Sequence, residues 1–124
     1  IFPTFHTMKK LKDSFKFAFS GLKETLIFER NFRIMIVSAL LATGAMFYFE
    51  TSRTEKAIIF TAIFAVLTLE LVNTAIEQIL DFLEPMHHEQ VRIIKDLMAA
   101  VVLVACLGAT IIGLIVFWPH FFKY

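Results

Sequence analysis

Three carboxylates and one carboxamide recur within a single apolar stretch of the chain, at the spacing of one helix face. If residues 70–81 are helical, Glu70, Asn73, Glu77 and Asp81 fall within about 80° of one another around the helix axis. Burying ionised carboxylates is unfavourable unless a cation or hydrogen-bond donors compensate for the lost water. The pattern therefore predicts a polar site on an otherwise apolar helix.

The composition indicates a membrane protein. The chain has 124 residues, enough for one domain, and 58% of them are hydrophobic, above the ~45–50% of soluble domains. The net charge of +1 provides no overall basic field, so nucleic acid is not an expected partner. The lone cysteine, Cys106, excludes a disulfide framework within the chain and a cysteine metal site. No cleavable signal peptide is visible, because the first long apolar run begins only near Ile34.

Helical periodicity predicts four segments. Residues 8–28 have phenylalanines and leucines on one side and lysines on the other, which suits the headgroup boundary of a membrane; packing on a soluble core is the alternative. Three apolar spans follow, at about 32–49, 57–83 and 92–118. The predicted fold class is all-α: one integral membrane domain over residues 1–124, with three transmembrane helices preceded by an N-terminal amphipathic surface helix.

Charge placement predicts the depth and the orientation of the polar stripe. Only the uncharged residues 57–69 precede Glu70 in the second span, which places its carboxylate at membrane depth. Pro85 cannot continue the helix without losing a hydrogen bond, so this span should end before it. Nine of the twelve lysines and arginines lie in residues 1–33 or 84–96, so these regions should be cytoplasmic.

With this topology several polar groups are expected at one cytoplasmic level. Glu29 precedes the first span, and Lys95 and Asp96 begin the third. Mg²⁺ commonly uses one or two carboxylates together with substrate phosphates, and Lys95 is placed to meet a phosphate. A carboxylate removed from water, such as Glu70, can act as a base. A Mg²⁺-nucleotide facing a lipid alcohol is the chemistry that these groups suit.

Other interpretations remain open at this point. In a small proton-coupled transporter, Glu70 would instead be an intramembrane proton carrier, and a purely structural protein is a third possibility. Lys95 could simply anchor a helix at the cytoplasmic side. Glu84 and His87 have the spacing of a di-iron ligand pair, but Pro85 interrupts the helix and no second copy of the motif occurs. No glycine-rich P-loop is present, which excludes that kind of nucleotide site.

The chain resembles the prokaryotic diacylglycerol kinase family, which includes the undecaprenol kinases. The central match is Glu-Leu-Val-Asn-Thr-Ala-Ile-Glu-x-x-x-Asp over residues 70–81. It is supported by Glu-x-x-Phe-Arg at 29–33, His-Glu at 88–89 and Lys-Asp at 95–96. The match spans roughly residues 9–105 without an obvious gap.

The resemblance implies an ATP-dependent enzyme that transfers the γ-phosphoryl group to the hydroxyl of a membrane lipid alcohol. The form of residues 29–33 resembles the undecaprenol kinase branch, which slightly favours undecaprenol over diacylglycerol. A homotrimer in the bacterial inner membrane is implied, multi-pass, with active sites shared between subunits on the cytoplasmic side.

The resemblance also implies a role for each matching residue. Glu70 would be the general base that deprotonates the lipid hydroxyl, and Asn73 would help to position Glu70 or the reacting groups. Glu29 and Glu77 would bind the Mg²⁺ of ATP, while Arg33 would border the lipid groove. The nucleotide would be held by four further residues: Lys10, His88, Lys95 and Asp96.

Overall fold

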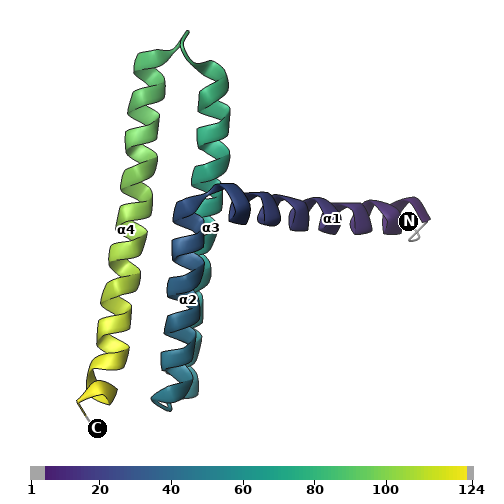
Figure 1. Cartoon of the computed structure of the whole chain (residues 1–124). Coiled ribbons are helices and arrows are strands. Elements are labelled where there is room, and N and C mark those ends of the chain that lie inside the picture. The colour runs from purple at the N-terminus through teal and green to yellow at the C-terminus, as the bar shows by residue number, and fades with distance from the viewer. Residues whose placement is uncertain (1–4, 123–124) are drawn as a thin grey trace.

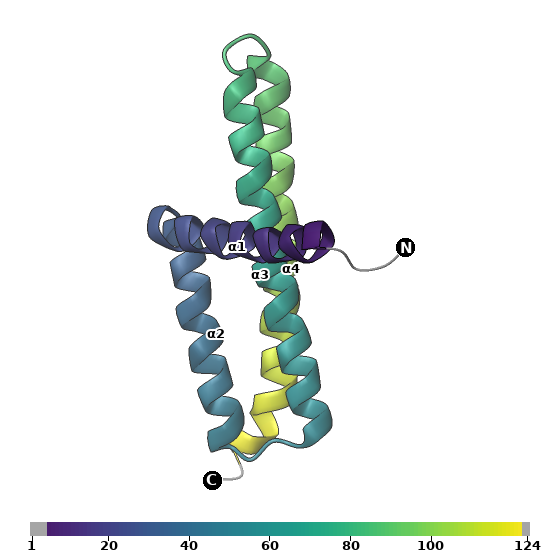
Figure 2. The ribbon, with the colours of Figure 1, turned by 90° about the vertical axis from the view of Figure 1, so that its right-hand side faces the viewer.

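The computed structural model describes residues 5–122, which form four helices: α1 (Phe5–Phe28), α2 (Arg30–Tyr48), α3 (Arg53–Leu83) and α4 (His88–Phe121). α3 and α4 form a long antiparallel hairpin, and α2 lies beside the first half of α3 (Figure 1). α1 begins away from the bundle and meets it at the corner with α2, and its axis lies crosswise to those of the other helices (Figures 1 and 2). The described residues contain no strand, so the predicted all-α class is confirmed.

Three of the helices, α2, α3 and α4, are long and apolar enough to cross a membrane. They correspond to the three predicted spans, and α1 is the helix predicted to precede them. α3 ends at Leu83, two residues before Pro85, as the missing proline N–H requires. α3 begins at Arg53 rather than near residue 57, because its polar first turn is helical as well. The chain is a multi-pass membrane protein by these criteria.

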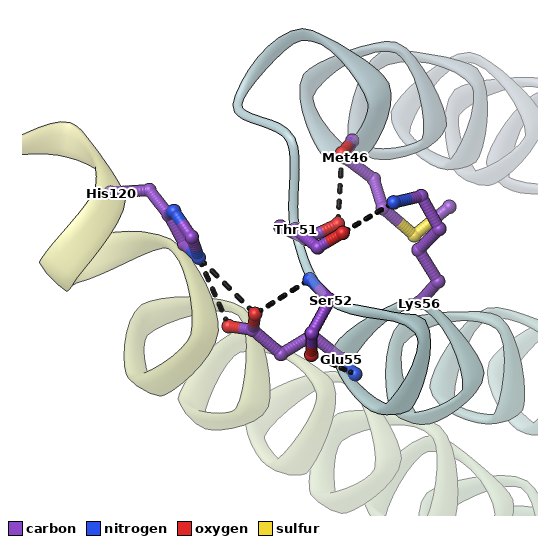
Figure 3. Close-up of polar contacts among 6 residues, drawn as sticks. All are labelled: Met46, Thr51, Ser52, Glu55, Lys56 and His120. Atoms are coloured by element: carbon purple, nitrogen blue, oxygen red, sulfur yellow. Dashed lines mark hydrogen bonds and ion pairs between the residues drawn. The ribbon is translucent and has the colours of Figure 1, made fainter.

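A capping box fixes the start of α3. The Ser52 hydroxyl accepts a hydrogen bond from the Glu55 N–H at 3.1 Å, and the Glu55 carboxylate accepts one from the Ser52 N–H at 2.9 Å (Figure 3). The same carboxylate lies 3.1 Å from Nε2 of His120, near the end of α4. These contacts satisfy N–H groups that a helix start leaves without partners. They also join the start of α3 to the end of α4.

Removal of this cap gives a first test. Ser52→Ala is expected to lower the free energy of unfolding by about 1 kcal/mol, because an N-cap hydroxyl is lost. Reversible unfolding in mixed detergent micelles of rising dodecyl sulfate content measures the change. Ser38→Ala is the matched control, because the Ser38 hydroxyl only bonds the Ile34 carbonyl within α2. Equal stability of the two variants would contradict the role given to the cap.

A small cluster of buried apolar side chains lies at the end of the bundle far from the α3–α4 turn. Met46, Ile59 and Val116 form it, one from each of α2, α3 and α4. Many other large apolar side chains are exposed along the same helices, including Leu40 and Val104. Exposed apolar surface on this scale is expected of helices surrounded by lipid or by other membrane helices.

The unequal lengths of α2 and α3 determine where the polar stripe lies. α3 has 31 residues and α2 has 19, so at 1.5 Å per residue α3 is longer by about 18 Å. Its second half and the start of α4 therefore extend past the level of α1 (Figures 1 and 2). Glu70 begins this second half, about 26 Å along the helix from Arg53.

The corner between α1 and α2 lies near this level, and Arg33 stabilises it. Its guanidinium donates hydrogen bonds to the carbonyl oxygens of Leu26, at 3.0 Å, and Ile27, at 2.6 Å. These carbonyls belong to the last turn of α1 and have no partner within the helix itself. Arg33 thereby fixes the point from which α1 leaves the bundle.

Candidate active site

α3 buries the polar residues that begin its stripe. Glu70 is 3% exposed and Asn73 is 9% exposed, whereas Asp81 at the end of the stripe is exposed. Glu77, between them, is half-buried. The helix therefore carries a buried carboxylate and a buried carboxamide on one face, and the exposure of the carboxylates to water rises from Glu70 to Asp81. A buried carboxylate without compensation is unfavourable, which marks Glu70 as a candidate functional group.

Two further carboxylates lie close to that of Glu70. The charges of Glu77 and Glu29 both interact with the Glu70 carboxylate. Glu77 is two turns farther along α3, and Glu29 is the N-cap residue of α2, beside the α1–α2 corner. The Glu29 side chain makes no capping hydrogen bond, so its carboxylate is free of the usual task of an N-cap side chain. The structure therefore brings three predicted site residues together from two helices.

The chemistry of this donor set fits Mg²⁺ held jointly with a ligand. Within residues 5–122, no group of three or more histidine, cysteine, aspartate or glutamate side chains converges as a metal site. Mg²⁺ needs no such cage, because one or two carboxylates suffice when phosphate oxygens and water complete its shell. Two of the three neighbouring carboxylates can serve as ligands, and a divalent cation between them would relieve their mutual repulsion.

Lys95 meets α3 at a different level. Its ammonium lies 2.9 Å from Oδ1 of Asp81 and 3.7 Å from an oxygen of Glu84. Asp81 is 11 residues, or about 16 Å along the helix, beyond Glu70. Lys95 therefore meets the exposed end of the polar stripe, at a carboxylate with which it was expected to share the cytoplasmic level. The Lys95 charge also interacts with that of Glu77, which connects the two parts of the stripe.

The other predicted nucleotide residues on α4 are exposed and have local partners. His88 lies 3.4 Å from a carboxylate oxygen of Glu84 at the end of α3. Asp96 accepts a hydrogen bond from Arg92, one turn earlier, at 3.2 Å. Together with Lys95 they form an exposed polar surface around the start of α4, beyond the buried carboxylates.

Lys10 is the predicted site residue that this chain does not bring to the others. It is exposed and lies 18 residues before the end of α1, or about 27 Å from the corner. That half of α1 points away from α2, α3 and α4 (Figure 1). Arg33 contacts the carbonyls of α1, and its predicted place beside a lipid groove stays a prediction.

Two features of the structure were not predicted. Thr74 is 5% exposed and lies on the polar stripe one turn after Glu70, and its hydroxyl oxygen has no hydrogen-bond partner. A helical wheel places it on that face, but a threonine carries no charge that would draw attention to it. The contact between Glu55 and His120 joins residues 65 positions apart, and no local pattern predicts such a pair.

The fold and the site define a multi-pass membrane protein with a buried carboxylate, two further carboxylates near it and a charged, exposed helix start. Residues 16–117 match the family model for prokaryotic diacylglycerol kinase. The match covers most of the chain, so the protein belongs to this family. It is accordingly a lipid kinase.

Individual relatives agree with this membership. An undecaprenol kinase of Bacillus subtilis (strain 168) is 39% identical over 106 residues, which cover 86% of each chain. A diacylglycerol kinase of Escherichia coli (strain K12) is 30% identical over 105 residues, or 85% of this chain and 86% of that one. A diacylglycerol kinase of Synechocystis sp. is 32% identical over 101 residues, which are 81% of this chain and 58% of that protein.

Proposed function

We propose that the protein transfers the γ-phosphoryl group of ATP to the hydroxyl of a membrane lipid alcohol. The observation that carries the proposal is the buried Glu70 carboxylate, with the carboxylates of Glu29 and Glu77 beside it, in a chain of a lipid kinase family. Phosphoryl transfer needs little covalent chemistry from the protein. Positioning the reactants and neutralising charge account for most of the catalysis.

Each carboxylate has a separate task in the proposed reaction. Glu70 accepts the proton of the lipid hydroxyl as its oxygen bonds to the γ-phosphorus and the bond to ADP breaks. Asn73, one turn away and buried, positions Glu70 or the reacting groups. Glu29 and Glu77 would hold the Mg²⁺ of ATP, which supplies neutralisation of phosphate charge.

The nucleotide is proposed to lie along the start of α4, against His88, Lys95 and Asp96. The Lys95 ammonium is paired with Asp81 in the structure, so a phosphate would have to replace that carboxylate or bind the ammonium together with it. Lys10 can join the site only from another copy of the chain or after a movement of α1. In the homotrimer with shared sites that we propose, a neighbouring copy would supply Lys10. The proposed location is the bacterial inner membrane, with the active sites on the cytoplasmic side.

Undecaprenol is the slightly favoured acceptor, and diacylglycerol is the other. The relative named as an undecaprenol kinase is 39% identical, and the Escherichia coli relative named as a diacylglycerol kinase is 30% identical, over similar lengths. Both alcohols place a hydroxyl at the membrane surface and their chains in the hydrocarbon. The level of Glu70, near the corner of the surface helix, suits either.

A transfer assay tests the proposal. Purified protein in mixed micelles with Mg²⁺-ATP is offered undecaprenol or diacylglycerol separately, and labelled γ-phosphate is followed into the lipid. Phosphorylation of one or both lipids is expected, with undecaprenol the better acceptor. Absence of transfer to either lipid, together with absence of Mg²⁺-dependent ATP binding, would overturn the proposal and favour a proton-coupled transporter.

A further inference from the structure

The hydroxyl of Thr74 is buried and lacks the hydrogen bond that six other helical hydroxyls make. In the described part of the chain, six serine and threonine hydroxyls each donate to the carbonyl oxygen four residues earlier in their own helix, as is usual for apolar helices. They are Ser14, Thr25, Ser38, Thr43, Thr61 and Thr110. The hydroxyl oxygen of Thr74 is fully buried and has no partner.

The usual acceptor for the Thr74 hydroxyl would be the backbone carbonyl oxygen of Glu70. The carbonyl four residues before Thr74 is that of Glu70, and the hydroxyl does not bond it. The Thr74 hydroxyl therefore retains its donor, and a buried unused donor is rare enough to require an explanation.

The Glu70 carboxylate is an acceptor within reach of the Thr74 hydroxyl along the helix. Side chains four apart on a helix are neighbours, with roughly 5–6 Å between their Cβ atoms. Glu70 and Thr74 are 3% and 5% exposed. Among residues 5–122, no hydrogen bond or ion pair of the structure reaches the Glu70 carboxylate, and Lys95 is paired with Asp81.

The surroundings of Glu70 make a donor valuable there. Its carboxylate is buried and lies beside the charges of Glu29 and Glu77. A donated hydrogen bond favours a charged carboxylate over its neutral form and fixes its direction. The Asn73 side-chain oxygen, adjacent in the chain, is likewise buried without a partner. Two unused polar atoms beside one buried carboxylate indicate a site whose hydrogen bonds are completed only when it is occupied.

We propose that Thr74 is a positioning residue whose hydroxyl donates a hydrogen bond to the Glu70 carboxylate when the reactants are bound. The bond holds the carboxylate with its other oxygen facing the lipid hydroxyl. This inference rests on the proposed function, because it assigns Thr74 to the orientation of the proposed base. Thr74 itself does not touch the substrate.

Paired substitutions at Thr74 test the inference. Thr74→Val keeps the shape of the side chain without the hydroxyl, and Thr74→Ser keeps the hydroxyl. Thr74→Val is expected to lower kcat about 10-fold, because a hydrogen bond to a charged group is lost, while the KM for ATP stays unchanged. Thr74→Ser should retain kcat to within about twofold. Thr61→Val, which removes an exposed hydroxyl bonded to the Ala57 carbonyl, is the matched control and should match wild type.

Thermal unfolding of the same proteins separates a catalytic role from a structural one. The Thr74 hydroxyl has no hydrogen-bond partner in the structure, so Thr74→Val should unfold at the same temperature as wild type or higher. Wild-type kcat in Thr74→Val would overturn the inference. So would a lowered unfolding temperature that Thr74→Ser does not restore. An inactive wild-type protein would instead overturn the proposed function, and the role of Thr74 with it.

Discussion

Glu70→Gln is expected to abolish phosphoryl transfer while leaving ATP binding nearly unchanged. Glutamine has the same shape and hydrogen-bonding reach as glutamate, but it cannot accept the proton of a lipid hydroxyl. A positioned general base contributes about 10²–10⁴-fold to the rate, and kcat should fall by that factor. Initial rates at saturating lipid and Mg²⁺-ATP measure kcat, and calorimetric titration with Mg²⁺-ATP measures binding.

The surroundings of Glu70 make this variant informative about folding as well. The wild-type carboxylate is 3% exposed and lies beside the charges of Glu29 and Glu77. Replacing it by a neutral amide removes this repulsion, so the variant should be at least as stable as wild type. A loss of rate can then not be ascribed to unfolding.

A matched control and the contrary outcomes complete this test. Glu50→Gln makes the same chemical change at an exposed residue in the α2–α3 turn, before the start of α3, and should retain wild-type kcat. Retained turnover in Glu70→Gln would remove Glu70 from the role of base. A loss of ATP binding in this variant would show that Glu70 belongs to the nucleotide site instead.

Features that depend on a single helix could be predicted well from the sequence. The burial of Glu70 and Asn73 on one face follows from the rotation of about 100° per residue. The end of α3 before Pro85 follows from the chemistry of proline. In both cases the cause is local, so a single stretch of sequence carries enough information.

The position of one helix relative to another could not be predicted in the same way. The level at which Lys95 meets α3 depends on the stagger of α3 against α4, which the turn between them and the side-chain packing determine together. Sequence spacing does not determine that stagger, and the structure pairs Lys95 with Asp81, about 16 Å along the helix beyond Glu70. Lys10 shows the same limitation, because periodicity predicts α1 but not the direction in which it leaves the corner held by Arg33.

The missing hydrogen bond of the Thr74 hydroxyl could not be predicted for another reason. Most helical hydroxyls here bond the preceding turn, and their residues then behave as neutral members of the helix. Only the coordinates show that Thr74 departs from this habit. Local rules fail most informatively at functional sites, where a residue is selected for a bound state rather than for the resting chain.

Glu77→Gln is expected to weaken the Mg²⁺ dependence of the reaction rather than its limiting rate. Glu77 is half-buried, and its charge interacts with those of both Glu70 and Lys95, so it lies between the proposed base and the start of α4. A metal ion bound there would contact the carboxylate directly. Second-shell partners are worth roughly 10–100-fold in metal affinity, so loss of a direct ligand should cost at least about 100-fold.

The Mg²⁺ concentration that gives half-maximal rate, measured at fixed ATP, reports this loss. In Glu77→Gln it should rise at least about 100-fold, and part of the wild-type rate should return as Mg²⁺ is raised. Glu70→Gln should recover nothing, because added Mg²⁺ cannot replace a proton acceptor. An unchanged Mg²⁺ dependence in Glu77→Gln would contradict its role as a ligand. If the two variants exchanged these responses, the base would be Glu77 and the ligand Glu70, although the same three carboxylates would still form the site.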